Sequence, residues 1–322
     1  MALILSSTPF RVSFFGGGSD RPQHYRKSVG RVLSTSIDKF LHVAINKKFD
    51  SQFRISYLKT ENVCHIDDIQ HQLARECLRF MAVDSPVEIS SMADIPANGS
   101  GLGSSSTYTV GLLNALHSYL GDPTTKVDLA TQACHIEIDV CGKQIGKQDQ
   151  FASAFGGFNL IEFFKDESVK VHPVMCNAST LYTLNKHLLM CHTGISRDAS
   201  DTLSASVSTD DSLGYLTTMS DMALRAYEDI SNNKIEAFGQ LLHDSWMLKR
   251  KAFNTASTPQ IDTWYEQARS CGAVGGKILG AGSGGFFVFF ADPKYHQDIL
   301  MGTGLRHVPF NFEHLGSQIR LK

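Results

Sequence analysis

The feature that most constrains this chain is a glycine- and serine-rich segment, Pro96–Ser106, that leads directly into an apolar helix. Glycine lets backbone N–H groups approach an anion, and the first turn of a helix adds unpaired N–H donors and the positive end of the helix dipole. The run Ser104–Leu120 is apolar nearly all round, which predicts a buried central helix. The segment therefore predicts a phosphate-binding loop, formed by Pro96, Gly99, Gly101, Leu102, Gly103, Ser104, Ser105 and Ser106.

Other interpretations of this segment fit the sequence less well. A helix that is capped by one serine needs neither three glycines nor three serines. A dinucleotide-binding turn has the form GxGxxG close to a strand, with an acidic residue about twenty positions later. A Walker A loop ends in lysine followed by serine or threonine, whereas GAVGGKI at 272–278 has the wrong spacing and no hydroxyl after its lysine.

The order of the predicted elements favours an α+β fold in two domains. Polar and turn residues gather at Asn177–Lys186, so we expect a nucleotide-binding domain at 1–183 and a second domain at 184–322. A helix that begins at Thr125 with a capping box would end at Gly142. The other expected helices are 67–82, 213–231, 234–250 and 259–272, and the expected strands are 1–15, 32–47, 53–58, 87–92, 158–164, 169–174, 188–192, 286–291, 306–312 and 318–321.

Composition argues against several classes of protein. A nucleic-acid-binding protein usually carries a basic excess, whereas this chain has a formal net charge of −2. The longest apolar runs are too short to span a bilayer, and the first residues lack the basic start and apolar core of a signal peptide. The seven cysteines are scattered and form no CxxC pair, so we expect free thiols in a reducing cytoplasm.

Three segments, in the expected order, resemble the signature motifs of the GHMP kinases, a family named for galactokinase, homoserine kinase, mevalonate kinase and phosphomevalonate kinase. TPFRVSFFGGGSD at Thr8–Asp20 resembles the first motif, and the loop with GLGSSS resembles the second. KILGAGSGGF at Lys277–Phe286 resembles the third, a glycine-rich turn that braces the phosphate loop. Within the family, bacterial kinases of D-glycero-D-manno-heptose 7-phosphate share the strings at Leu33–Phe40, Ile145–Asn159 and His192–Ser200.

This resemblance implies a two-domain GHMP kinase fold, with an N-terminal domain like ribosomal protein S5 domain 2 and a ferredoxin-like C-terminal domain. It implies phosphoryl transfer from ATP, with Mg²⁺, to the anomeric hydroxyl of the heptose 7-phosphate. The product would be the 1,7-bisphosphate, on the route to nucleotide-activated heptose for surface glycans. The expected partners are ATP and a phosphorylated sugar, without nucleic acid or membrane, and the chain would be a cytoplasmic monomer or homodimer.

The resemblance also implies roles for four polar residues. Asp149 aligns with the family's catalytic aspartate, and Arg11 aligns with the basic residue that pairs with it. An arginine between apolar neighbours on a strand needs such a partner. Asp149 would either deprotonate the acceptor hydroxyl or anchor the site electrostatically, and the sequence leaves both roles open. Glu137 aligns with the Mg²⁺ glutamate, and we pair it with Ser105 because this cation prefers oxygen ligands.

The substrate side of the site is predicted from the first and third motifs. Asp20 aligns with the aspartate that binds sugar hydroxyls in galactokinase. Galactokinase has a glutamate and a histidine in the turn before it, whereas this chain has Gly17 and Gly18, which leaves room for a larger substrate. Gly282 is expected at the sugar pocket. For the distal phosphate we favour Lys147 and Arg197 because they lie in strings shared with the heptose kinases, and the other basic candidates are Arg21, Arg26, Lys27 and Arg31.

The sequence leaves alternative functions open. The acceptor could instead be fucose, an N-acetylhexosamine or a mevalonate-type alcohol. A catalytically silent regulator that binds ATP and sugar would be expected to lack Asp149 or the phosphate loop, and this chain has both. A dinucleotide-binding protein is a more distant alternative.

Overall fold

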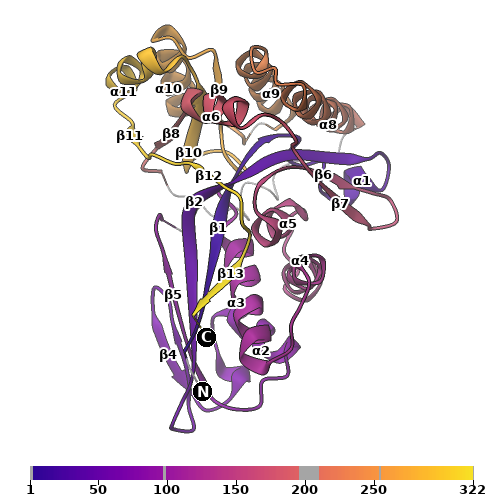
Figure 1. Ribbon diagram of the computed structural model, residues 1–322, viewed down its shortest axis with the longest axis vertical. Helices are drawn as coiled ribbons and strands as arrows, with labels where there is room; N and C mark the ends of the chain where they lie inside the picture. The colour runs from indigo at the N-terminus through magenta and orange to yellow at the C-terminus, as the bar shows by residue number, and fades with distance from the viewer. Residues whose placement is uncertain (1–2, 97–98, 196–209, 254, 322) are drawn as a thin grey trace.

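The computed structural model describes residues 3–96, 99–195, 210–253 and 255–321, which form two β-sheets covered by helices (Figure 1). The larger sheet has nine strands, with the main order β13-β1-β2-β5-β3-β4. In addition, β6 and β12 pair with β2, and β7 pairs with β6. Its strands are β1 (Ile4–Phe15), β2 (Gly30–Lys47), β3 (Phe53–Ser56), β4 (Thr60–Val63), β5 (Val87–Ala93), β6 (Phe158–Phe163), β7 (Val169–Pro173), β12 (Phe312–Glu313) and β13 (Gln318–Leu321).

Helices cover one face of this sheet, and α3 (Ser104–Leu120) lies against β1 and β2 at its centre (Figure 1). Its side chains are buried over most of its circumference, which confirms the predicted central helix. A left-handed glycine, Gly103 or Gly121, stands at each end of α3. The other elements here are α1 (Pro22–Tyr25), η1 (Ile66–Asp68), α2 (Gln72–Phe80), α4 (Lys126–Cys134), η2 (His135–Val140) and α5 (Gln148–Phe155).

The smaller sheet is antiparallel, with the strand order β11-β8-β10-β9. In chain order these strands are the fourth, first, third and second of a βαββαβ unit, which is the ferredoxin-like arrangement expected from the sequence. The strands are β8 (Leu188–His192), β9 (Gly275–Ile278), β10 (Phe286–Phe290) and β11 (Arg306–His307). The helices around them are α6 (Ala178–His187), α8 (Asp210–Ser231), α9 (Phe238–Ala252), α10 (Pro259–Ser270) and α11 (His296–Thr303).

Three local predictions differ from the structure. The polar segment expected to be a boundary, Asn177–Lys186, is mostly helix α6. The strand expected at 306–312 is split into β11 and β12, because Pro309 has no N–H to donate to a ladder. The helix expected to run from Thr125 to Gly142 is α-helical only as far as Cys134 and continues as a π-helical turn, η2.

The two halves of the chain are joined closely. The last strands, β12 and β13, return from the second half to the first sheet, so a division at 183 separates the sheets except for this tail. Phe238 of α9 packs edge-on against Phe14 and Phe15 of β1, and all three are buried in one core. None of the described helices is long and apolar enough to cross a membrane.

Candidate functional site

The loop before α3 has the backbone conformation that its glycines predict. Gly99, Gly101 and Gly103 have φ angles of 64°, 73° and 79°, a region that residues with a Cβ rarely adopt. Inside the loop, Ser100 Oγ lies 2.8 Å from Ser104 Oγ and accepts the N–H of Leu102. Pro96 precedes Ala97 and Asn98, which are outside the described residues. These glycines place the loop backbone at the start of a buried helix, where unpaired N–H groups can bind an anion.

A second glycine-rich turn, residues 279–285, packs directly on this loop. A Cβ on Gly101 would lie 2.4 Å from the carbonyl oxygen of Leu279, and a Cβ on Gly280 would lie 2.5 Å from Gly101 Cα. A Cβ on Gly285 would lie 2.3 Å from the carbonyl oxygen of Ser100. The third motif thus contacts the phosphate loop backbone to backbone, as expected. Gly282 itself packs on Ala256, whose carbonyl oxygen would be 2.4 Å from an added Cβ.

Arg11 and Asp149 form a two-pronged ion pair beneath the loop. The Arg11 side chain is only 3 % exposed, and its Nε and Nη2 donate to the two Asp149 oxygens at 2.8 and 2.9 Å. Its Nη1 donates to the Gly101 carbonyl at 2.7 Å, so the same guanidinium supports both the loop and the carboxylate. A Cβ on Gly103 would lie 3.1 Å from Asp149 Oδ2. Asp149 therefore lies directly at the start of α3, where the loop would hold phosphate.

The surroundings of Asp149 favour its neutral form more than water does. Burial raises the pKa of the Asp149 carboxyl, contact with Arg11 opposes this, and the nearby Asp20 and Glu137 add to the rise. A carboxylate with a raised pKa takes up a proton more readily than a solvated one. The site is therefore suited to receiving a hydroxyl proton, and the Arg11 contact fixes the direction of the carboxylate.

Glu137 lies on η2, the widened turn that follows α4, and its side chain is fully buried. It accepts hydrogen bonds from Ser105 Oγ at 2.7 Å, Gln150 Nε2 at 2.7 Å and Lys143 Nζ at 2.9 Å. The expected pairing of Glu137 with Ser105 is therefore present. The π-helical turn buries both Ile136 and Glu137, which are adjacent in sequence.

The oxygen atoms around Glu137 suit Mg²⁺. A hydroxyl and a carboxylate are ligands that this cation prefers, and Gln150 Oε1 is a buried carbonyl oxygen with no hydrogen-bond partner among the described residues. The Lys143 ammonium now balances the Glu137 charge and would have to move to admit a metal ion. The described residues contain no cluster of three or more His, Cys, Asp or Glu that could hold a metal ion.

Asp20 is buried beneath the segment that carries Asp149. Its Oδ1 accepts the Gly18 N–H at 3.0 Å, and its Oδ2 accepts the Gln148 N–H at 3.1 Å, at the first residue of α5. A Cβ on Gly146 would lie 1.9 Å from Asp20 Oδ2, so a larger residue would displace the carboxylate. Asp20 therefore fixes the start of α5, a role that the sequence did not indicate.

The turn formed by Gly17 and Gly18 faces the second half of the chain. A Cβ on Gly18 would lie 3.0 Å from Leu216 of α8 and 3.9 Å from the ring of Phe253, which follows α9. On the other side, Gln148 Nε2 lies 4.0 Å from the Cβ position of Gly17. The turn thus lies between Gln148 and the helices of the second half.

Lys147 is held by the β6–β7 hairpin. Its ammonium lies 2.6 Å from Glu167 Oε2 and 4.9 Å from the ring centre of Tyr25. Although burial opposes the effect, hydrogen bonds from Lys147, Tyr25 and Arg26 lower the pKa of Glu167 to about 2. In this structure Lys147 therefore forms an ion pair with Glu167. Arg197 lies outside the described residues.

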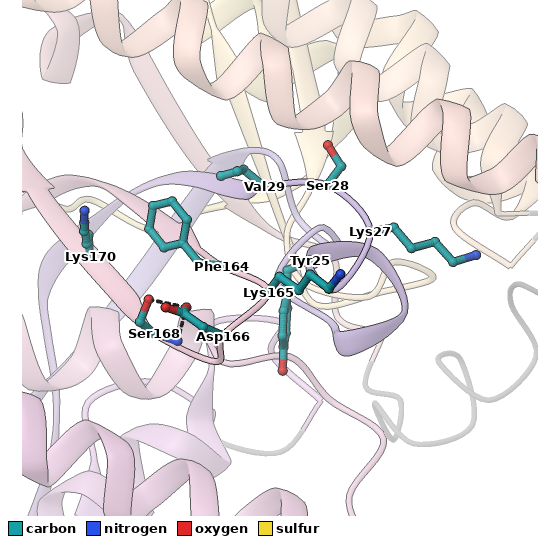
Figure 2. Close-up of a pocket in the computed structure, with 9 residues that line it drawn as sticks. All are labelled: Tyr25, Lys27, Ser28, Val29, Phe164, Lys165, Asp166, Ser168 and Lys170. Atoms are coloured by element: carbon teal, nitrogen blue, oxygen red, sulfur yellow. Dashed lines mark hydrogen bonds between the residues drawn. The ribbon is translucent and has the colours of Figure 1, made fainter.

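An open hollow of about 640 Å³ lies beside the same hairpin (Figure 2). Figure 2 shows Asp166 and Ser168 hydrogen-bonded to each other at its rim. Neither Arg11 nor Asp149 lines it, so the loop and the Arg11–Asp149 pair, rather than this hollow, mark the candidate site. The lining residues are Tyr25, Lys27, Ser28, Val29, Phe164, Lys165, Asp166, Ser168 and Lys170.

Lys249 is a buried lysine near the loop that was not expected from the sequence. Lys249, in the last turn of α9, is 7 % exposed and donates to the Gly280 carbonyl at 2.6 Å. The signal was its spacing: it follows Trp246 by three residues and Leu242 by seven, which places it on the buried stripe of the helix. Its two basic neighbours made it resemble the usual charged end of a helix.

The loop, the ion pair and the oxygen cluster define an ATP-dependent phosphotransferase, and comparison with known proteins gives its family. The family model for the GHMP kinases N terminal domain matches residues 65–157, and the model for GHMP kinases C terminal matches residues 226–300. Together they cover more than half of the chain. The chain belongs to the GHMP kinase family.

Individual relatives are similar over nearly the full length. A D-glycero-alpha-D-manno-heptose 7-phosphate kinase of Campylobacter jejuni is 29% identical over 315 residues, which cover 93% of each chain. The structure of a putative sugar kinase from Campylobacter jejuni superposes with a TM-score of 0.79 at 25% identity, covering 99% of this chain and 98% of the other. A D-glycero-D-manno-heptose 1-phosphate kinase from Bacteroides thetaiotaomicron gives a TM-score of 0.81 at 22% identity, covering 98% of each, and shows the shared fold.

Proposed function

We propose that this chain is a sugar kinase that transfers the γ-phosphoryl group of ATP to the anomeric C1 hydroxyl of D-glycero-D-manno-heptose 7-phosphate. The observation that carries the proposal is the position of Asp149, which Arg11 grips at the start of α3, directly beside the phosphate loop. An acceptor hydroxyl that contacts Asp149 would lie next to a phosphate held by that loop.

The reaction follows from this arrangement. The C1 oxygen attacks the γ-phosphorus in line, the bond from that phosphorus to the bridging oxygen breaks, and ADP leaves. The hydroxyl proton passes to an Asp149 oxygen, while Arg11 keeps the carboxylate directed at the acceptor. Backbone N–H groups of the loop and the start of α3 stabilise the negative charge on the phosphate oxygens.

Mg²⁺ belongs to this proposal as the cation that neutralises the nucleotide phosphates. Glu137 and Ser105 would hold it from the protein side, with Gln150 Oε1 as a further oxygen. Lys143, which now contacts Glu137, is only partly buried and can turn outward when the cation binds.

Two observations support heptose 7-phosphate as the acceptor. The Campylobacter jejuni relative that carries this substrate in its name is similar along nearly the whole chain. Gly17 has no side chain, and the atoms nearest to its Cβ position, Gln148 Nε2 and Ser13 Oγ, are 4.0 Å away, which suits an acceptor that lies against this turn.

The test is a panel of acceptors with the purified chain, Mg²⁺ and ATP, followed by ADP release. We expect heptose 7-phosphate to give a kcat/KM at least about a hundredfold above those of L-fucose, galactose, N-acetylhexosamines and mevalonate. Phosphorus NMR of the product should show a new phosphate on C1. Turnover of L-fucose with none of heptose 7-phosphate would overturn the acceptor, and transfer to C7 of heptose 1-phosphate would overturn the position.

A further inference from the structure

The ammonium group of Lys249 lies buried between the two halves of the chain with few partners. It has three N–H donors, and the Gly280 carbonyl, at 2.6 Å, is its acceptor among the described residues. No described carboxylate forms an ion pair with it. Burying a charged amine in this way is costly unless something compensates the charge. The Lys249 ammonium therefore lacks a compensating negative charge among the described residues.

The charges nearest to Lys249 are also positive. Burial lowers the pKa of Lys249 to about 8, and the positive charges of Arg11 and Arg21 contribute to this shift. Arg11 is already neutralised by Asp149. Arg21 is largely withdrawn from solvent, and burial lowers its pKa, although Asp20 opposes that effect. Among the described residues its guanidinium has one long hydrogen bond, 3.3 Å to the Gln144 carbonyl. Arg21 and Lys249 come from different halves of the chain, and each keeps N–H donors that have no acceptor among the described residues.

Arg21 follows the glycine turn, and the helix that carries Lys249 ends beside this turn. Arg21 follows Asp20, whose carboxylate is bonded to the Gly18 N–H. Lys249 precedes Phe253 by one helical turn, and the Phe253 ring lies 3.9 Å from the Cβ position of Gly18. The nucleotide phosphates already have the loop before α3, so the spare donors of Arg21 and Lys249 are available to a different anion.

We propose that Lys249 and Arg21 together bind the phosphate group that the acceptor sugar carries away from its reacting hydroxyl. This inference rests on the proposed function for the identity of the sugar. A phosphate monoester brings close to two negative charges and several acceptor oxygens, which match one ammonium and one guanidinium. The bound dianion would supply the compensating charge that Lys249 lacks.

A structural role for Lys249 makes a different prediction. Its hydrogen bond to Gly280 supports the turn that packs on Gly101 of the phosphate loop. If that were its only role, loss of the ammonium would loosen the loop and weaken ATP binding. If Lys249 binds the acceptor phosphate, the loss appears in the KM for the sugar phosphate.

The first experiment compares wild type with Lys249→Met and Arg21→Gln, and uses Lys251→Met, an exposed residue of the same helix, as the control. We expect KM for heptose 7-phosphate to rise about ten- to a hundredfold in both variants, the loss typical of one charge-assisted contact, with KM for ATP changed less than twofold. Lys251→Met should match wild type. A rise in KM for ATP alone would show a structural role and overturn the proposal.

The second experiment does not depend on turnover. The chain is saturated with a non-hydrolysable ATP analogue and Mg²⁺, so that the loop is occupied, and inorganic phosphate is added while the melting temperature is recorded. Phosphate should raise the melting temperature of wild type and of Lys251→Met, but not that of Lys249→Met. An equal rise in all three overturns the site. If no sugar is phosphorylated but the Lys249-dependent rise is present, the proposed function fails and the anion site stands.

Discussion

At the scale of single residues, the site depends on one guanidinium that serves two elements. Arg11 donates two hydrogen bonds to Asp149 and one to the Gly101 carbonyl, which fixes the position of the carboxylate relative to the loop. A lysine at this position could offer the charge but not the planar fork. Transfer in the proposed mechanism therefore depends on the geometry of Arg11 as well as on its charge.

Asp149→Asn should separate binding from transfer. The amide keeps the size of the carboxylate, and its single oxygen can accept one of the two Arg11 hydrogen bonds. Arg11 also keeps its bond to the Gly101 carbonyl, so ATP binding is expected to change much less than transfer. It cannot take a proton, and kcat should fall about a hundred- to ten-thousandfold, the usual effect of losing a general base. Calorimetry of ATP binding and single-turnover transfer measure the two effects. If transfer is unchanged, Asp149 is not part of the mechanism.

The acid limb of the pH–rate profile reports the same carboxyl. Because burial raises the pKa of Asp149, the active carboxylate is lost on acidification at a higher pH than for a solvated aspartate. We therefore expect kcat/KM to fall as pH decreases through a pKa above 3.8. The limb should disappear from the residual activity of Asp149→Asn. A limb that persists in the variant would belong to another group or to the substrate.

Glu137→Gln should raise the Mg²⁺ requirement. The change removes the negative charge but leaves an oxygen that can accept from Ser105. We expect the Mg²⁺ concentration at half-maximal rate to increase about tenfold or more, since charge dominates binding of a hard cation. Asp139→Asn, an exposed carboxylate of the same turn, is the control and should behave as wild type. An unchanged Mg²⁺ requirement in Glu137→Gln would remove this residue from the proposed metal shell.

At the scale of elements, two glycine-rich turns from different halves of the chain pack together at the candidate phosphate site. The close approach of Gly101 and Gly280 leaves no space for a side chain on either. The turn at 279–285 contributes rigidity to the loop, and Lys249 secures it from α9. A phosphate loop that is held from behind loses less conformational entropy when it binds its ligand.

Gly280→Ala tests this bracing without altering the loop itself. The added Cβ would lie 2.5 Å from Gly101 Cα, and the residue has a φ of 68°, so the turn must shift. We expect Kd for ATP to rise about tenfold or more, from a strain of about 1–3 kcal/mol. The control is Gly214→Ala on α8, where nothing lies within 4 Å of the new Cβ. Wild-type ATP affinity in Gly280→Ala would show that the loop needs no support.

At the scale of the whole molecule, the sequence predicted the parts of the site that lie in contiguous strings. The loop at 99–106 and the helix after it have the predicted backbone conformation, because glycine spacing and apolar periodicity are local properties. The ferredoxin-like second half, which the structure also has, was implied by the family resemblance. Lys249 and Lys277 were not predicted, since a buried lysine differs from an exposed one only in what the fold places around it. The same reason applies to the contact of Asp20 with Gln148, a residue 128 positions away.

Lys277 is a buried lysine that links the second half of the chain to the first. It lies on β9, is 4 % exposed, and donates to the carbonyls of Ser13 and Phe14 on β1 at 3.0 and 2.8 Å. Burial, with Lys249 and Arg11 nearby, lowers the pKa of Lys277 well below that of a solvated lysine. The folded state therefore disfavours its charged form. The stability linked to Lys277 is present above the unfolded pKa of 10.5 and is lost as pH falls through the folded value.

Lys277→Met should accordingly become more harmful as pH rises. The neutral amine keeps two N–H donors for the two carbonyls, whereas methionine leaves both unpaired, at about 1–3 kcal/mol each. At lower pH the variant also escapes the burial of a charge, which offsets part of that loss. Urea unfolding at several pH values between 7 and 10 should show the wild-type advantage growing, with Lys251→Met parallel to wild type throughout. The free energies of unfolding of wild type and Lys277→Met could instead differ by the same amount at every pH. The Lys277 charge would then not couple the two halves, which would leave the aromatic contacts of Phe238 with β1 to join them.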